Sequence, residues 1–448
     1  MSTAAEKTAA QNASAQTAAQ LTSASLTPAQ KTALELGEYA VASPSSYHAA
    51  DQASRRLQAA GYELLDEAQT WNLTPGGRYV LVREGAVAAF ALPADVSADA
   101  LRYRVFGAHT DSPGFKLKPG GAHTAAGFTQ VGVEVYGGVL LNSWLDRELC
   151  FAGRLALRDG TTVLARTPGI ARIPQLAIHL DRQVNEGLKL DRQQHTVPVV
   201  GLEVCGGDVI GLLAESAGVS ADQVVGHDVI TAPVQEAALF GASQELLACS
   251  RMDNLSSTFA GLRAMEELDT KNLTAVSVFI SNDHEEVGSE TRTGASGPML
   301  ADFLERVSIS VGADREAHLR AIAGSICISA DAGHAVHPNY PERHDPQVRP
   351  ALGEGLLLKL NAVQRYATDA VGTAEWARLC DEAGVQYQPF VSNNAMPCGS
   401  TIGPLTATRL GMTVVDAGIP LLSMHSAREM AAVEDVEALV KVAAAHLG

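Results

Sequence analysis

The sequence SNDHEEVG, residues 281–288, places two adjacent carboxylates, Glu285 and Glu286, directly after an apolar run. That run, AVSVFI at residues 275–280, is uninterrupted and rich in β-branched residues, which predicts a fully buried central strand. In an open α/β sheet, ligands bind at the carboxyl ends of the strands. Adjacent carboxylates repel each other, so such a pair usually has a cation nearby or gives up one charge. A Glu-Glu pair alone is more often part of a solvated acidic loop than of a cation site. The residues at the other strand ends are needed to distinguish these two interpretations.

Four other strand-like runs also end in a residue type that binds metal ions. These residues are His109 after the run 101–108, Asp253 after 246–249, Asp331 after 325–330, and His425 after 413–422. Each has a plainer explanation by itself; Asp253, for example, stands where a helix N-cap would stand. Together they predict that the side chains meet at one rim of a single sheet.

Two His, two Asp and one Glu, without Cys, suit Zn²⁺, with Mn²⁺ or Co²⁺ as alternatives. The number of these candidate ligands fits two ions that share a bridging carboxylate, with one His and one further carboxylate on each ion. Two-metal sites activate a water between the ions, and one carboxylate must stay off the metals to take its proton. Spacing alone does not decide whether Glu285 or Glu286 has that role. Asp111, two residues after His109, is expected to orient the imidazole.

Composition limits the classes of protein. The chain has 448 residues, of which 46% are hydrophobic and 19% charged, as in a globular protein with a large core. Its net charge of -17 argues against nucleic acid or an anionic membrane surface as a partner. No apolar run approaches the ~20 residues of a spanning helix. Six scattered cysteines fit a reducing compartment, so we expect a cytoplasmic protein.

The pattern along the chain predicts an α/β fold, with a mixed central sheet covered by helices on both faces. Residues 1–27, rich in Ala, Ser, Thr and Gln, are expected to be a mobile tail. Residues 28–113 and 243–448 are expected to form the α/β catalytic domain. Short alternating strands between them predict an inserted β-rich domain at 114–242, of a kind that commonly builds oligomer contacts or roofs an active site.

Local signals add further expectations. Residues 28–61 have helical apolar spacing, and Asp159-Gly160 is a hairpin signal. His179 stands on an apolar, strand-like run at 173–180, where a core histidine is the plain interpretation. Ser426 and Glu429 match a capping box that opens the last helical region.

The longer motifs resemble those of the aspartyl aminopeptidase family of cocatalytic metallopeptidases, from about Tyr39 to the C-terminus. They are HTDSPG at 109–114, RMDNL at 251–255, HEEVGS at 284–289, SAD at 329–331 with HAVHPNY at 334–340, CGSTIGP at 398–404, and MHSAREM at 424–430. The family commonly has Met-Ala where this chain has Ala332-Gly333, which is a mild departure.

The resemblance implies a role for each matched residue. Asp253 would bridge two ions, with His109 and Asp331 on one, Glu286 and His425 on the other, and Glu285 as general base and acid. His179 would contact substrate, in some descriptions across a subunit interface; a minority view makes it a metal ligand. His334 and Lys359 match substrate-contacting positions. Family members remove N-terminal Asp or Glu from peptides with a free N-terminus and assemble as twelve-subunit shells, which implies a homo-oligomer, here a dodecamer.

Two alternatives remain: a non-catalytic shell or scaffold relative, and a different amide hydrolase of the same clan. An intact Glu285 and a complete ligand set argue against the scaffold. The net charge of -17 is unexpected in an enzyme for acidic substrates. At physiological salt, charges are screened over ~8 Å, so the field of distant charges is weak at the site. We therefore expect a local cation, Lys359, to determine the preference for acidic substrates.

Overall fold

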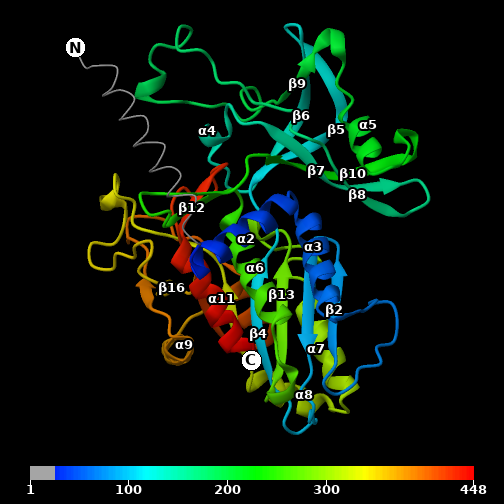
Figure 1. Ribbon diagram of the computed structural model, residues 1–448, viewed down its shortest axis with the longest axis vertical. Helices are drawn as coiled ribbons and strands as arrows, with labels where there is room; N and C mark the ends of the chain where they lie inside the picture. Colours follow the sequence, from blue (N-terminus) through cyan, green and yellow to red (C-terminus); the bar gives the residue numbers. More distant parts are fainter. Residues whose placement is uncertain (1–25) are drawn as a thin grey trace, which may run out of the picture.

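The structure is a computed structural model that describes residues 26–448 (Figure 1). Nearly all of the tail expected at 1–27 lies outside the described residues. Within residues 26–448, no helix combines the length and the apolar character needed to cross a membrane.

The central sheet has nine strands and contains the buried strand expected at 275–280. That strand is β13, Val276–Asn282, and every one of its residues is buried. It lies between β3 (Ala86–Ala91), which is antiparallel to it, and β4 (Tyr103–His109), which is parallel. The full order is β1 (Glu63–Leu64), β2 (Arg78–Arg83), β3, β13, β4, β14 (Ile326–Ala330), β18 (Thr413–Gly418), β16 (Leu356–Lys359), β17 (Tyr387–Phe390).

Helices cover both faces of this sheet, because alternate strand residues point to opposite sides. Phe279 packs in the core under one helical layer, whereas Val278 and Ile280 pack under the other. The first layer consists of α2 (Pro28–Ala42), α3 (Ser46–Ala59), α6 (Met252–Glu266), α9 (Ala370–Ala383) and α11 (Val433–Leu447). The second consists of α7 (Met299–Ser310), α8 (Arg315–Ala323) and α10 (Ile402–Leu410). The predicted mixed α/β class is confirmed.

A second, six-stranded sheet lies above the central one in Figure 1 and has its own apolar core. Its order is β8 (Thr162–Arg166), β7 (Leu149–Leu157), β10 (Val224–Pro233), β5 (Gly114–Ala125), β6 (Phe128–Tyr136), β9 (Val199–Leu202), with α4 (Leu141–Trp144) and α5 (Val209–Ser216) beside it. The hairpin expected at Asp159-Gly160 joins β7 to β8, and Gly160 has φ of 87°. The domain boundaries themselves stay a prediction.

The fold also contains two small sheets. One contains β11 (Ala238–Phe240), β12 (Leu246–Cys249) and β20 (Glu429–Ala432), and the other contains β15 (Gly333–His334) and β19 (Pro420–Leu421).

Three local expectations differ from the structure. The helical segment at 28–61 is two helices, because Pro44 lacks an N–H and the Ser45 side chain caps α3. The capping box at Ser426 is wrong: Glu429 begins β20, and α11 starts four residues later without a side-chain cap.

The third difference concerns His179. Residues 174–195 pair with no named strand, so the predicted strand at 173–180 is wrong. Leu176 and Leu180 are 58% and 76% exposed, and His179 is exposed as well. The core interpretation of His179 is therefore wrong for the single chain, since nothing in residues 26–448 covers this loop.

Candidate metal centre

Four of the predicted residues lie at or just after the carboxyl ends of three strands of the central sheet. His109 is the last residue of β4 and pairs in register with Asn282 of β13, while Asp331 follows β14. Glu285 and Glu286 lie in a short 3-10 helix, η5 (Glu285–Val287), just after β13. Because β4, β13 and β14 are parallel, all three ends lie at one edge.

Asp253 and His425 reach the same place from outside the central sheet, which corrects the expectation of a single rim. Asp253 lies in the first turn of α6, directly after β12 of the three-stranded sheet. His425 lies between β19 and β20, in the loop that returns to that sheet. The apolar run before Asp253 is β12 of the three-stranded sheet, whereas the run before His425 contains β18 of the central sheet followed by β19 of the two-stranded sheet.

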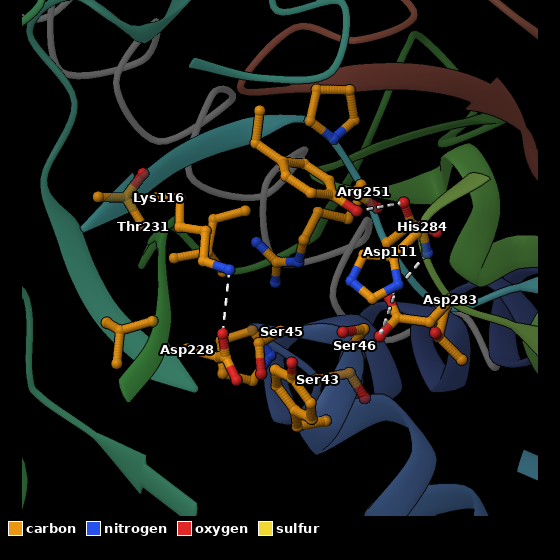
Figure 2. Close-up of a pocket in the computed structure, with 18 residues that line it drawn as sticks. Ser43, Ser45, Ser46, Asp111, Lys116, Asp228, Thr231, Arg251, Asp283 and His284 are labelled. Atoms are coloured by element: carbon orange, nitrogen blue, oxygen red, sulfur yellow. Dashed lines mark hydrogen bonds and ion pairs between the residues drawn. The ribbon is translucent and has the colours of Figure 1, made fainter. Parts of the chain in front are cut away.

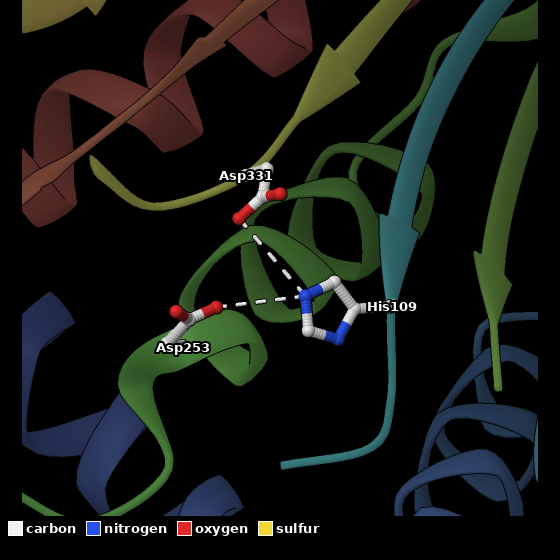
Figure 3. A group of neighbouring side chains, drawn as sticks. All are labelled: His109, Asp253 and Asp331. Atoms are coloured by element: carbon white, nitrogen blue, oxygen red, sulfur yellow. Dashed lines mark ion pairs between the residues drawn. The ribbon is translucent and has the colours of Figure 1, made fainter. Parts of the chain in front are cut away.

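The five side chains form one cluster around Asp253, and the two oxygens of its carboxylate face different histidines. Oδ1 lies 3.5 Å from His109 Nε2, which is also 4.0 Å from Asp331 Oδ1 (Figure 3). Oδ2 lies 3.2 Å from His425 Nε2, which is 3.4 Å from Glu286 Oε1. This is the arrangement in which one carboxylate can bridge two ions.

Both the distances between these side chains and the buried carboxylate oxygens without hydrogen-bond partners are consistent with bound metal ions. Two donors that are each roughly 2.0–2.1 Å from one tetrahedral ion lie about 3.3 Å apart, close to the separations observed. Among the described residues, Asp253 Oδ1 and Glu286 Oε1 are buried and have no hydrogen-bond partner. Unsatisfied buried carboxylate oxygens are costly, and a cation removes that cost.

The histidines are oriented as metal ligands usually are. His109 Nδ1 lies 3.0 Å from the Asp111 carbonyl oxygen, and His425 Nδ1 lies 3.1 Å from that of Gly138. When Nδ1 donates to a carbonyl, the neutral ring presents Nε2 as a lone pair, and both Nε2 atoms face the carboxylates. Imidazole nitrogen and carboxylate oxygen, without thiolate, are the donor set of zinc or of Mn²⁺ and Co²⁺.

Burial and mutual repulsion perturb the carboxylates. Burial raises the pKa of Glu285 to about 8, and it raises the pKa of Glu286 well above its ordinary value, with Asp253 adding to the effect. Burial would lower the pKa of His425, but Asp253 and Glu286 outweigh it and raise the pKa to about 10. Without cations the cluster retains protons, and divalent ions would displace them.

Asp111 does more than the predicted orientation of His109. Its Oδ1 lies 3.3 Å from His109 Nδ1 and accepts the backbone N–H of Glu285 at 3.0 Å. Its Oδ2 accepts the N–H of Glu286 at 3.1 Å and the hydroxyl of Tyr136 at 2.8 Å. One buried carboxylate thus fixes the imidazole and the turn that carries both glutamates.

Glu429 was missed as a site residue. Its buried carboxylate accepts the backbone N–H groups of Asp253 and His425, at 3.1 and 2.8 Å. The signal was present as an acid four residues after a candidate ligand, but it was interpreted as half of a capping box.

Comparison with known proteins now identifies the chain. A family model described as Aminopeptidase I zinc metalloprotease (M18) matches residues 39–446. The chain belongs to the M18 family. It is a zinc aminopeptidase of that family, which confirms the resemblance and the expected metal.

Relatives and solved structures agree with this assignment. A Streptomyces coelicolor protein named Probable M18 family aminopeptidase 2 is 47% identical over 92% of this chain and 96% of its own length. The cryo-EM structure of an Ape4 and Nbr1 complex contains a chain that is 33% identical, with TM-score 0.89 over 93% of this chain and 85% of that one. The S. cerevisiae mApe1 dodecamer gives 28% identity and TM-score 0.80, over 93% and 96%.

The three residues assigned to substrate by the M18 resemblance lie in different settings. Lys359 is buried; its ammonium donates to the Ala332 carbonyl at 2.8 Å and lies 3.8 Å from Asp331 Oδ1. His334 is exposed, and its ring packs edge-to-face against Phe390. His179 lies on the exposed loop described above and makes no hydrogen bond or ion pair with the cluster within residues 26–448 of the single chain.

Proposed function

We propose that this M18 enzyme removes N-terminal residues from peptides with a free N-terminus, prefers Asp and Glu there, and uses two zinc ions. The observation that carries the two-ion proposal is the position of Asp253, whose two oxygens face His109 and His425 separately. His109 and Asp331 would hold one ion, and Glu286 and His425 the other. Zinc in such a site acts as a Lewis acid on a carbonyl and lowers the pKa of water.

Exposure supports Glu285, rather than Glu286, as the general base. The Glu285 side chain is 17% exposed and its Oε2 lies 3.8 Å from His109 Nε2, at the open side of the cluster. The Glu286 side chain is 4% exposed and its Oε1 faces His425. Glu285 can therefore take a proton from the attacking water and transfer it to the leaving amine.

The proposed acidic preference rests on Lys359. It is the cation beside the cluster, and one hydrogen bond to Ala332 leaves two ammonium N–H groups for a substrate carboxylate. His334, next to it in the fold, is exposed and available to substrate. The net charge of -17 would not attract acidic peptides, so this local cation has to supply the selectivity.

We also propose a dodecamer in which the domain at 114–242 builds contacts and His179 reaches the site of an adjacent subunit. The likeness to a dodecameric relative supports this assembly. So does the loop around His179, where Leu176, Ile178 and Leu180 are all at least half exposed.

A substrate panel tests the function. Asp-, Glu-, Leu- and Lys-p-nitroanilides and N-acetyl-Asp-p-nitroanilide are assayed with and without chelator, and we expect turnover of the unblocked acidic substrates only, abolished by the chelator. Faster hydrolysis of the Leu substrate would refute the acidic preference, and hydrolysis of the acetylated one would indicate a different amide hydrolase.

Zinc content tests the bridging role separately. Asp253→Ala is expected to lose both ions by elemental analysis, while Asp269→Ala, an exposed control, keeps them. Full occupancy in the Asp253 variant would exclude the bridge.

A further inference from the structure

A cavity of about 50 Å³ lies beside the metal centre, between the α2–α3 junction and the six-stranded sheet (Figure 2). Ser43 and Ser45 line it from the junction, Lys116 and Asp228 from the sheet, and Asp283 from the end of β13. A cavity needs only ~10–15 Å³ to hold one water, so this one has room for a small ion and some water.

Arg251 extends into this cavity as a cation without a counter-charge. It is 8% exposed, and Figure 2 shows its guanidinium pointing to the centre of the space. Nη2 donates to the carbonyl of Ala40 at 2.6 Å, at the end of α2. Nε and Nη1 are buried and have no partner among residues 26–448. A guanidinium remains charged in a protein, so this site requires an acceptor that carries negative charge.

Two other charged groups that line the cavity, Lys116 and Asp228, are paired with each other. Lys116 Nζ lies 3.0 Å from Asp228 Oδ1, and Asp228 Oδ2 accepts from Arg154 at 2.8 Å. Asp283 Oδ1 accepts the N–H of His284 at 2.9 Å, whereas Oδ2 is buried without a hydrogen-bond partner among the described residues and lies 3.7 Å from His284 Nδ1. None of these acids bonds to Arg251.

We propose that the cavity binds one small monovalent anion, of halide size, on Nε and Nη1 of Arg251. Water could satisfy the two N–H groups but would leave the buried charge uncompensated. The carboxylate of Asp283, which lines the same cavity, disfavours a divalent anion.

The site is independent of the proposed substrate but has a structural link to the metal centre. Arg251 stands two residues before Asp253 and also caps α2. An anion on its guanidinium ties together α2, the second sheet and the turn that carries Asp253. Its binding therefore stabilises the fold whether or not zinc is present.

Bromide diffraction tests the site directly on the unmodified full chain. Crystals grown in a halide-free gluconate buffer are soaked in bromide, and anomalous scattering locates the ions. We expect a peak within hydrogen-bond distance of Arg251 Nε and Nη1. A cavity that contains only water, with bromide confined to the surface, overturns the proposal.

Thermal unfolding tests it in solution with a matched control. In chloride, the Tm should rise with the logarithm of concentration above Kd, and equal ionic strength of gluconate should have no such effect. Arg251→Met should lose the chloride response, while Arg166→Met, which removes a guanidinium from the neighbouring Val41 carbonyl outside the cavity, should keep it.

Zinc-loaded and chelator-treated protein are compared in the same melts. A chloride response confined to the zinc-loaded form would place the anion on the metal and overturn the assignment to Arg251. If Arg251→Met does not fold, the bromide result on the unmodified chain decides.

Discussion

The Glu429 carboxylate accepts the backbone N–H of Asp253 at 3.1 Å, and its other oxygen accepts that of His425 at 2.8 Å. A single buried side chain thus sets the separation of two candidate ligands that come from different parts of the chain. Residues that orient metal ligands typically contribute 10–100-fold to affinity.

We therefore expect Glu429→Gln to weaken zinc binding by about 10–100-fold, because the new amide N–H₂ would face a backbone N–H. Competition with a chromophoric chelator measures the affinity. Activity should return when zinc is raised to saturation, which separates positioning from catalysis. Glu434→Gln, on the exposed side of α11, is the control. Unchanged zinc affinity in the Glu429 variant would refute the positioning role.

Glu285→Gln should retain zinc and lose about 10²–10⁴-fold in kcat, because the base acts both on the attacking water and on the leaving amine. Steady-state kinetics together with elemental analysis check both parts. Glu290→Gln, exposed in the same loop, should behave as wild type. Near-normal turnover in the Glu285 variant would reassign the base to another carboxylate.

Lys359→Met should lower kcat/KM for Asp and Glu substrates by about 10–100-fold more than for Leu, since a charge-assisted hydrogen bond contributes ~1.5–3 kcal/mol. Lys359 also neighbours Asp331, so some loss on every substrate is expected. The ratio of the two kcat/KM values is the informative quantity. An equal loss on acidic and neutral substrates would mean that Lys359 serves only to hold Asp331.

Asp435 gives the stability of the fold a specific pH dependence. This buried carboxyl accepts the N–H groups of Gly353 and Gly355, at 2.7 and 3.2 Å, yet burial raises its pKa to about 7. The contribution of Asp435 to the free energy of unfolding is complete below about pH 4, the pKa of an Asp in the unfolded chain, because the carboxyl is then protonated in both states. As pH rises to about 7, the unfolded state releases the proton first and stability falls, by a few kcal/mol at most.

Asp435→Asn should remove that fall. The free energy of unfolding of wild type relative to the variant should be greatest at about pH 4 and below and should decline until about pH 7, as measured by urea denaturation. Parallel curves for wild type and Asp435→Asn would contradict the assignment.

The candidate ligands that lie at the ends of parallel strands could be predicted from the sequence. His109, Glu286 and Asp331 could be grouped because parallel strands end at a common edge, and that rule needs no side-chain detail. Asp253 and His425 could be predicted from the apolar runs that precede them. The small sheets next to them could not be predicted, because the sequence of a short strand does not indicate which strand it pairs with.

What escaped prediction depends on tertiary packing. Glu429 follows a serine at capping-box spacing, and only the fold shows that its carboxylate turns inward to two backbone N–H groups. The apolar residues around His179 resemble a core strand because an exposed surface loop that could meet another subunit has the same composition as an interior. The unpaired guanidinium of Arg251 has no sequence signature at all.

The candidate ligands span the chain from His109, near the start of the described fold, to His425, just before its final strand and helix. During synthesis, the last of these ligands is therefore added 316 residues after the first, because His425 follows His109 by that distance in the sequence. A chain that stops before His425 would lack one of the two histidines of the proposed centre, so we expect such a fragment to be unable to hold both ions.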